Sequence, residues 1–211
     1  MTPVDQQLTP PGGWHPSATP KIAPKETTEL SPMWRAVLWA GGKFANRRMG
    51  IASVPKVFLL LMRHRTLFRP WLRFASRLMP YGTLARRDTE LVILRVGWNC
   101  RSRYEWGQHV QIGLRSGLSA EEIARVAKGP DASGWSEKQA ALLRATDELH
   151  HDRRVADATW TTLEKHYKEK QLIEIGMLAG AYEMLAGVLN SVGLALEPEM
   201  ESALAEAAIH Q

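Results

Sequence analysis

The sequence predicts an all-α fold, in which a single helical domain follows an extended N-terminal arm. From residue 31 onward, apolar residues recur at spacings of three and four, the period of an amphipathic helix. Capping residues, glycines and prolines separate these periodic segments. Residues 1–30 instead hold six of the chain's 12 prolines and little apolar periodicity, so they cannot build a core. We therefore expect a Pro-rich arm at 1–30 and one all-α domain at 31–211.

The expected helices each have their own sequence signal. Ser31-Pro32 is typical of an N-cap and a first helical residue. Ser119 and Glu122 form a capping box, and Gly129-Pro130 ends that helix. In the arm, Trp14 favours docking over complete disorder. The expected helices cover 31–40 up to a break at Gly41-Gly42, then a segment from about 55, 66–78, 85–99, 102–116, 119–129, 136–150, 157–166 with Asp157 as its cap, 171–191, and a short alanine-rich C-terminal segment.

The segment 85–99 could also be a β-strand, because it contains several Val and Ile residues. We prefer a helix because the segment is long, and because Glu90, Leu91, Leu94 and Trp98 fall on a helical spacing. A break follows near Asn99. The segment is largely apolar, so we expect it to be mostly buried.

Composition narrows the functional classes. The chain has 211 residues, 45% of them apolar, a net charge of +5 and a pI near 9.5. Much of the excess charge is Arg between Arg35 and Arg103, but no helix-turn-helix, zinc-finger or RNA-binding signature accompanies it. We therefore expect a solvated basic face and no nucleic-acid partner.

The cysteine content and the apolar runs suggest a cytoplasmic protein. Cys100 is the only cysteine, which excludes an intramolecular disulfide and a Cys-rich metal site, and fits a reducing compartment. The N-terminus lacks the pattern of a secretory signal. The apolar run 57–62 is too short to span a bilayer, so no membrane association is expected.

Two adjacent histidines, His150 and His151, invite comparison with a metal site. Adjacent residues point to different faces of a helix, and no third ligand is spaced to join them. We therefore expect a solvated helix end here, and no metal or cofactor.

The candidate chemistry lies between Glu90 and His109. Glu105 and His109 are four residues apart and share one helix face. If the two helices form an antiparallel hairpin with its turn near Asn99-Cys100, Glu90 comes to lie opposite His109. Two carboxylates and an imidazole can exchange protons, and an apolar setting raises one carboxyl pKa. The alternative is a surface Glu–His pair of little consequence.

The stretch RRDTELVILRVGWNCRSRYEWGQHVQIGLRSGLSAEEI resembles the core motif of the carboxymuconolactone decarboxylase family, which includes alkylhydroperoxidase D-like proteins. The resemblance is strongest over 55–130. It implies an alkylhydroperoxidase D-like helical bundle and homo-oligomers, as dimer, trimer or hexamer. The redox branch of the family carries Glu, then Cys-x-x-Cys, then His.

Mapped onto this chain, the family's Glu and His fall on Glu90 and His109, but the two cysteine positions hold Ser102 and Glu105. Peroxide reduction needs a thiolate and a resolving thiol, so thiol peroxidase activity is not expected. The lactone decarboxylase branch has Glu at the second position, as here.

The resemblance therefore implies acid–base catalysis without a cofactor, of lyase, decarboxylase or isomerase type. Its substrate would be a small organic acid, lactone or aromatic-catabolism intermediate, anionic or containing a carbonyl group. His109 would be the general acid or base, Glu105 would orient it or protonate carbon, and Glu90 would complete the relay. Candidate substrate-binding residues are Arg95, Arg101, Ser102, Tyr104 and Trp106. The alternatives are a non-catalytic ligand-binding or assembly protein of the same fold, or an antioxidant protein using Cys100.

Overall fold

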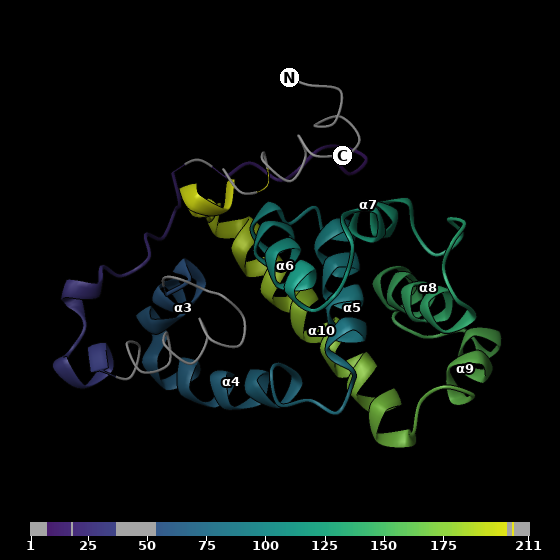
Figure 1. Ribbon diagram of the computed structural model, residues 1–211. Coiled ribbons are helices and arrows are strands. Elements are labelled where there is room, and N and C mark those ends of the chain that lie inside the picture. The colour runs from purple at the N-terminus through teal and green to yellow at the C-terminus, as the bar shows by residue number, and fades with distance from the viewer. Residues whose placement is uncertain (1–7, 18, 37–53, 202–203, 205–211) are drawn as a thin grey trace.

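The computed structural model describes residues 8–17, 19–36, 54–201 and 204. Within these ranges the chain is helical and contains no strand, which confirms the predicted all-α class. In Figure 1, α5 and α6 lie at the centre and α10 runs along the molecule, with α3 and α4 to one side and α7, α8 and α9 to the other.

The observed helices follow the predicted segments closely. Their bounds are η1 (Thr27–Glu29), α3 (Lys56–Leu61), η2 (Met62–His64), α4 (Arg65–Leu78), α5 (Arg86–Asn99), α6 (Arg103–Arg115), α7 (Ala120–Lys128), α8 (Glu137–Asp152), α9 (Asp157–Glu164) and α10 (Glu169–Val192). The predicted cap Ser119 is present on α7, and Ser136, at the start of the predicted segment 136–150, caps α8 in the same way. Asp157 is the first residue of α9 rather than its cap, which is Ala156.

Two predicted features lie partly or wholly outside the described residues. Residues 32–36 are helical, as predicted after Ser31, but the expected break at Gly41-Gly42 lies outside them. Most of the predicted alanine-rich C-terminal helix lies outside them as well.

Helix α5 is the centre of the core. It packs against α6, α7, α8 and α10, and the run from Leu91 to Leu94 is fully buried. A helix that is apolar on nearly every side needs neighbours all around it. Two acidic side chains, Asp88 and Glu90, are buried on this helix and therefore need polar partners.

A tight turn joins α5 to α6 and produces the predicted hairpin. Arg101 adopts a left-handed conformation with φ of 51°, and the amide of Ser102 donates to the carbonyl of Gly97 at 2.8 Å. The two helices approach closely at Gly97, where an added Cβ would lie 3.2 Å from the backbone nitrogen of Trp106. Only a residue without a side chain fits this spacing comfortably. The register of the hairpin is therefore set by its backbone.

The arm docks on this same turn. The indole of Trp14 packs edge-on against Trp98, with ring centroids 5.6 Å apart, and lies 5.9 Å from the ring of Trp106. The amide of His15 donates to the carbonyl of Arg101 at 3.1 Å, and the Arg101 guanidinium donates to the carbonyl of Gly12 at 3.0 Å. Aromatic packing and hydrogen bonds thus hold the arm on the hairpin.

Helix α10 backs the core and is the only helix of the described chain whose length and composition would suffice to cross a membrane. A buried core helix has the same character, and one side of α10 packs on α4, α5 and α8. Its buried Glu174 accepts hydrogen bonds from the amide and hydroxyl of Thr83, at 2.8 and 2.6 Å, and so fixes the turn before α5. Its other side exposes Ile173, Met177, Met184 and Val188.

Candidate active site

The hairpin brings Glu90 of α5 opposite His109 of α6. The Nδ1 atom of His109 lies 2.7 Å from Oε2 of Glu90. The side chain of Glu90 is fully buried and that of His109 is 7% exposed. A carboxylate at Nδ1 holds the imidazole in the tautomer with its proton on that nitrogen, which leaves Nε2 as the basic atom.

Arg86, one turn before Glu90, supplies a counter-charge. Its Nη2 atom lies 3.0 Å from Oε1 of Glu90, in an ion pair whose angles are not those of a hydrogen bond. The guanidinium is partly exposed and the carboxylate is not. Burying a carboxylate without a counter-ion is costly, and this pair offsets part of that cost. Arg86 was not among the predicted site residues, although its i,i+4 spacing to Glu90 is a signal visible in the sequence.

Glu105 is buried on the same face of α6, one turn before His109. Neither of its carboxyl oxygens has a hydrogen-bond partner among the described residues. Burial raises the pKa of this carboxyl well above its ordinary value. The Ser102 hydroxyl nearby opposes this in part, although its geometry falls outside that of a hydrogen bond. A buried carboxyl with a raised pKa is a neutral acid that can give up a proton.

Tyr182 of α10 completes the group. Its ring packs edge-on against His109, with centroids 5.1 Å apart. Burial, and then the negative charges of Glu90 and Glu105, raise the pKa of its hydroxyl well above 10. That hydroxyl donates to Sδ of Met79 at 3.5 Å. The hydroxyl of Tyr182 therefore interacts electrostatically with both carboxyls. The sequence offered no signal for this contact, because Tyr182 is far from Glu90 and His109 in the chain.

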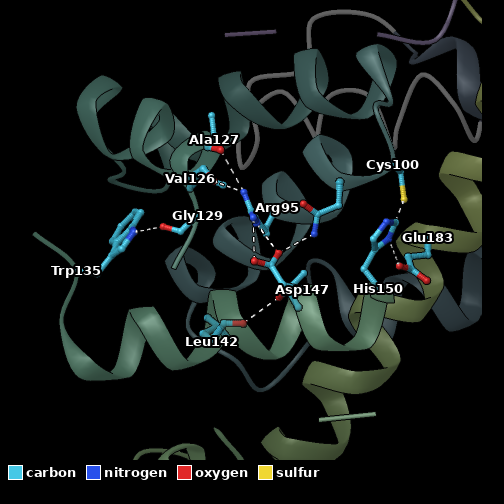
Figure 2. A network of polar contacts seen from close by, with 12 residues as sticks. Arg95, Cys100, Val126, Ala127, Gly129, Trp135, Leu142, Asp147, His150 and Glu183 are labelled. Carbon is cyan, nitrogen blue, oxygen red and sulfur yellow. Dashed lines mark hydrogen bonds and ion pairs between the residues drawn. The ribbon is translucent and has the colours of Figure 1, made fainter. Parts of the chain in front are cut away.

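Arg95, a predicted substrate-binding residue, lies in a network of hydrogen bonds between helices. Its guanidinium donates to both carboxylate oxygens of Asp147 at 2.6 and 2.8 Å, and to the carbonyl of Val126 at 2.9 Å (Figure 2). The arginine and aspartate side chains are 12% and 19% exposed. This pairing joins α5 to α8 and to the end of α7, so the structure does not bring Arg95 to His109.

The other four predicted substrate-binding residues lie in four different environments. Arg101 is bound to the arm. Tyr104 donates to Oε1 of the buried Glu197 at 2.9 Å and accepts from the amide of Val57 at 3.1 Å, so it belongs to a second apolar cluster. Trp106 is buried in the main core. Of the five, only Ser102 lies beside the buried carboxyl of Glu105.

Comparisons with known proteins agree with this arrangement. Residues 65–148 match the model of the carboxymuconolactone decarboxylase family. This segment contains α4 to α7 and most of α8, and therefore all of Glu90, Glu105 and His109. None of the curated proteins matches the chain.

Several solved structures share the fold at low sequence identity. A variant of the debrominase Bmp8 in complex with 2,3,4-tribromopyrrole superposes with a TM-score of 0.74 at 12% identity, covering 90% of this chain and 99% of that one. An alkylhydroperoxidase AhpD core protein from Ralstonia eutropha JMP134, a peroxidase-related protein, gives 0.74 at 18%, with 87% and 95% covered. A peroxidase-related protein from Silicibacter sp. TM1040 gives 0.71 at 12%, with 85% and 94% covered. The expected alkylhydroperoxidase D-like bundle is confirmed.

Proposed function

We propose that this chain, whose residues 65–148 match the model of the carboxymuconolactone decarboxylase family, is an enzyme that moves protons on a small carboxylated or carbonyl-containing compound, as a lyase, decarboxylase or isomerase. The observation that carries the proposal is the buried group of Glu90, His109 and Glu105. It combines an oriented imidazole with a neutral carboxylic acid. Groups whose environments push their pKa values apart are typical of acid–base sites.

The proposed reaction divides the work between the two helices. Glu90 fixes the tautomer of His109 and stabilises the imidazolium that forms when Nε2 takes a proton. In a decarboxylation, the bond to the carboxylate breaks, CO2 leaves, and its electron pair passes into an adjacent carbonyl to form an enolate. Glu105 then gives its proton to the carbon and becomes a carboxylate. The His109 imidazolium reprotonates it, and Nε2 takes a new proton from water. The edge-on ring of Tyr182 helps to hold the imidazole in place.

The antioxidant alternative has less support. Burial, and then the charges of Glu105 and Glu183, raise the pKa of the Cys100 thiol to about 12. A thiol at neutral pH is a poor nucleophile compared with a thiolate. The two positions that would hold sulfur in the redox branch are Ser102 and Glu105, so neither a nucleophilic thiolate nor a resolving thiol is provided there.

The family resemblance also suggests a substrate class and an oligomeric assembly, and we propose both. We take the substrate to be a small lactone or ring-derived acid from aromatic catabolism, handled in the cytoplasm without nucleic acid or membrane. The protein is proposed to act as a homo-oligomer. The exposed apolar residues Ile173, Met177, Met184 and Val188 of α10 give such an assembly an apolar contact surface.

The test is turnover in deuterated water. Purified full-length protein would be incubated with γ-carboxymuconolactone and then with related carboxylated lactones, and proton NMR would follow CO2 loss and the deuterium placed on carbon. We expect turnover by the wild type, and a loss of about 10²- to 10⁴-fold in His109→Ala.

The control is Glu121→Gln, which changes an exposed acidic residue on α7 and should leave turnover unchanged. Turnover in His109→Ala equal to the wild type would sink the proposed chemistry. Binding of these compounds without any turnover would favour the non-catalytic alternative.

A further inference from the structure

A second cluster of chemically active side chains lies beside the candidate active site. It contains Cys100 at the end of α5, His150 on the last turn of α8, and Glu183 on α10 (Figure 2). The three side chains point toward one another from three different helices, and one potential ligand atom from each lies within 4.8 Å of the other two. The proposed proton transfer does not use this cluster.

We infer that Cys100, His150 and Glu183 form a binding site for a divalent metal ion of the zinc class. Thiolate, imidazole and carboxylate are the three ligand types that Zn²⁺ takes in proteins, and three protein ligands leave a fourth position for water. The mixture of one soft sulfur with nitrogen and oxygen disfavours Mg²⁺ and Ca²⁺, which prefer oxygen alone.

The distances are close to those of a tetrahedral site. Zinc bonds of about 2.0–2.3 Å place ligand atoms about 3.3–3.7 Å apart. In the structure, Sγ of Cys100 lies 3.9 Å from Nδ1 of His150, and Nδ1 lies 2.6 Å from Oε1 of Glu183. Each of these two separations differs from the tetrahedral value by less than about 1 Å, a change that side-chain rotation can supply.

Neighbouring hydrogen bonds and ion pairs fix the positions of the proposed ligands. The side-chain amide of Asn190, on α10, donates through Nδ2 to the carbonyl of Cys100 at 2.8 Å and so fixes the position of the cysteine. Arg153 pairs with Oε2 of Glu183, which leaves Oε1 to face the imidazole. His150 and Glu183 are 24% and 19% exposed, so a hydrated ion has access to the cluster.

The ligands of this cluster are far apart in the sequence, so local spacing predicted no metal here. The neighbour of His150 in the sequence, His151, has an exposed side chain. The additional ligands come instead from positions 50 residues earlier and 33 residues later in the chain. Only the packing of α5, α8 and α10 brings them together.

Metal binding must displace the proton of Cys100, whose pKa is raised to about 12 by burial and then by the charges of Glu105 and Glu183, and lowered by Arg153. A divalent cation lowers the pKa of a thiol that coordinates it and can deprotonate it outright. Binding is therefore expected to release protons.

The experiment titrates the full-length, tag-free, reduced and chelator-treated protein with Co²⁺ and records the thiolate-to-cobalt charge-transfer band. We expect one equivalent to bind in the wild type and Zn²⁺ to displace it. Cys100→Ser should abolish the band, and His150→Ala and Glu183→Gln should weaken binding by about tenfold or more. The matched control is His151→Ala, which changes the adjacent histidine and should bind as the wild type does.

A second measurement needs no variant. Because Cys100 is the only cysteine, its reaction with a thiol reagent reports on this site alone. Saturating Zn²⁺ should slow that reaction by about tenfold or more, since a metal-bound thiolate is no longer the free nucleophile. Absence of the charge-transfer band together with unchanged thiol reactivity would overturn the inference, as would equal losses in His151→Ala and His150→Ala.

Discussion

His109 and Glu90 form a buried hydrogen-bonded pair across the α5–α6 hairpin, with Nδ1 and Oε2 2.7 Å apart. The carboxylate also pairs with Arg86. His109 is the donor, Glu90 is the acceptor and Arg86 is the counter-ion, and all three are on the two helices of one hairpin. Its geometry can be tested without knowledge of the substrate.

The first prediction concerns the tautomer of His109. Glu90→Gln keeps the shape of the side chain but offers an amide that can donate as well as accept. We expect the wild type to hold the proton on Nδ1, and the variant to populate the other tautomer as well. Nitrogen-15 NMR of the imidazole measures this directly. A fully retained Nδ1–H tautomer in the variant would contradict the assigned role of Glu90.

The second prediction concerns Glu105 and pH. The pKa of this carboxyl is raised in the folded protein above its ordinary value of 4.5. Between these two values the folded state holds a proton that the unfolded state has lost, so stability falls as pH rises, by up to about 1.4 kcal/mol per pH unit.

Glu105→Gln removes this titration. The free energy of unfolding of the variant, relative to the wild type, should therefore rise with pH above 4.5, as measured by urea denaturation at a series of pH values. A difference that is constant with pH would show that Glu105 is ionised in the folded protein.

The third prediction concerns Arg95. Arg95→Ala leaves Asp147 and the carbonyl of Val126 without their partner in a largely buried place, and should cost about 3 kcal/mol of unfolding free energy. Arg144→Ala, which breaks the exposed pair with Asp131, should cost under about 1 kcal/mol. Chemical denaturation compares the two. If Arg95→Ala kept full stability and lost turnover, Arg95 would be a substrate ligand after all.

The fourth prediction concerns assembly. Ile173 and Met177 are 67% and 48% exposed on α10, and a charge at either position would oppose burial in a subunit contact. We expect Ile173→Glu and Met177→Glu to lower the molar mass measured by light scattering after size-exclusion chromatography. Leu67→Glu, at an equally exposed apolar position on α4, is the control. An unchanged mass in both α10 variants would place the contact elsewhere.

Local signals in the sequence predicted most of the fold. Ser119 and Ser136 define their helix starts within a few residues, because capping depends only on neighbouring residues. The spacing of Glu90 and His109 about a turn near Asn99 was sufficient to predict their contact. These inferences need one helix or one hairpin, and no wider packing.

Contacts between distant helices could not be predicted in this way. From the sequence alone, the side chain of Arg95 could equally face a substrate. Its partner Asp147 is on α8, 52 positions later in the chain, and only the packing of α5 against α8 brings the two together. Tyr182 and Glu183 are neighbours in sequence, yet one packs on His109 and the other pairs with His150. Their roles depend on how α10 crosses the hairpin, which periodicity does not encode.

Gly97 shows how the alignment of reactive groups can depend on a residue that has none. Because a methyl group there would meet the backbone of Trp106 at 3.2 Å, α5 and α6 lie closer together than a side chain at this position comfortably allows. A larger residue at this position would wedge the hairpin open and draw the imidazole away from its carboxylate. Any redesign of this scaffold for a new substrate should therefore leave that position unaltered, and seek its variation in the side chains around it.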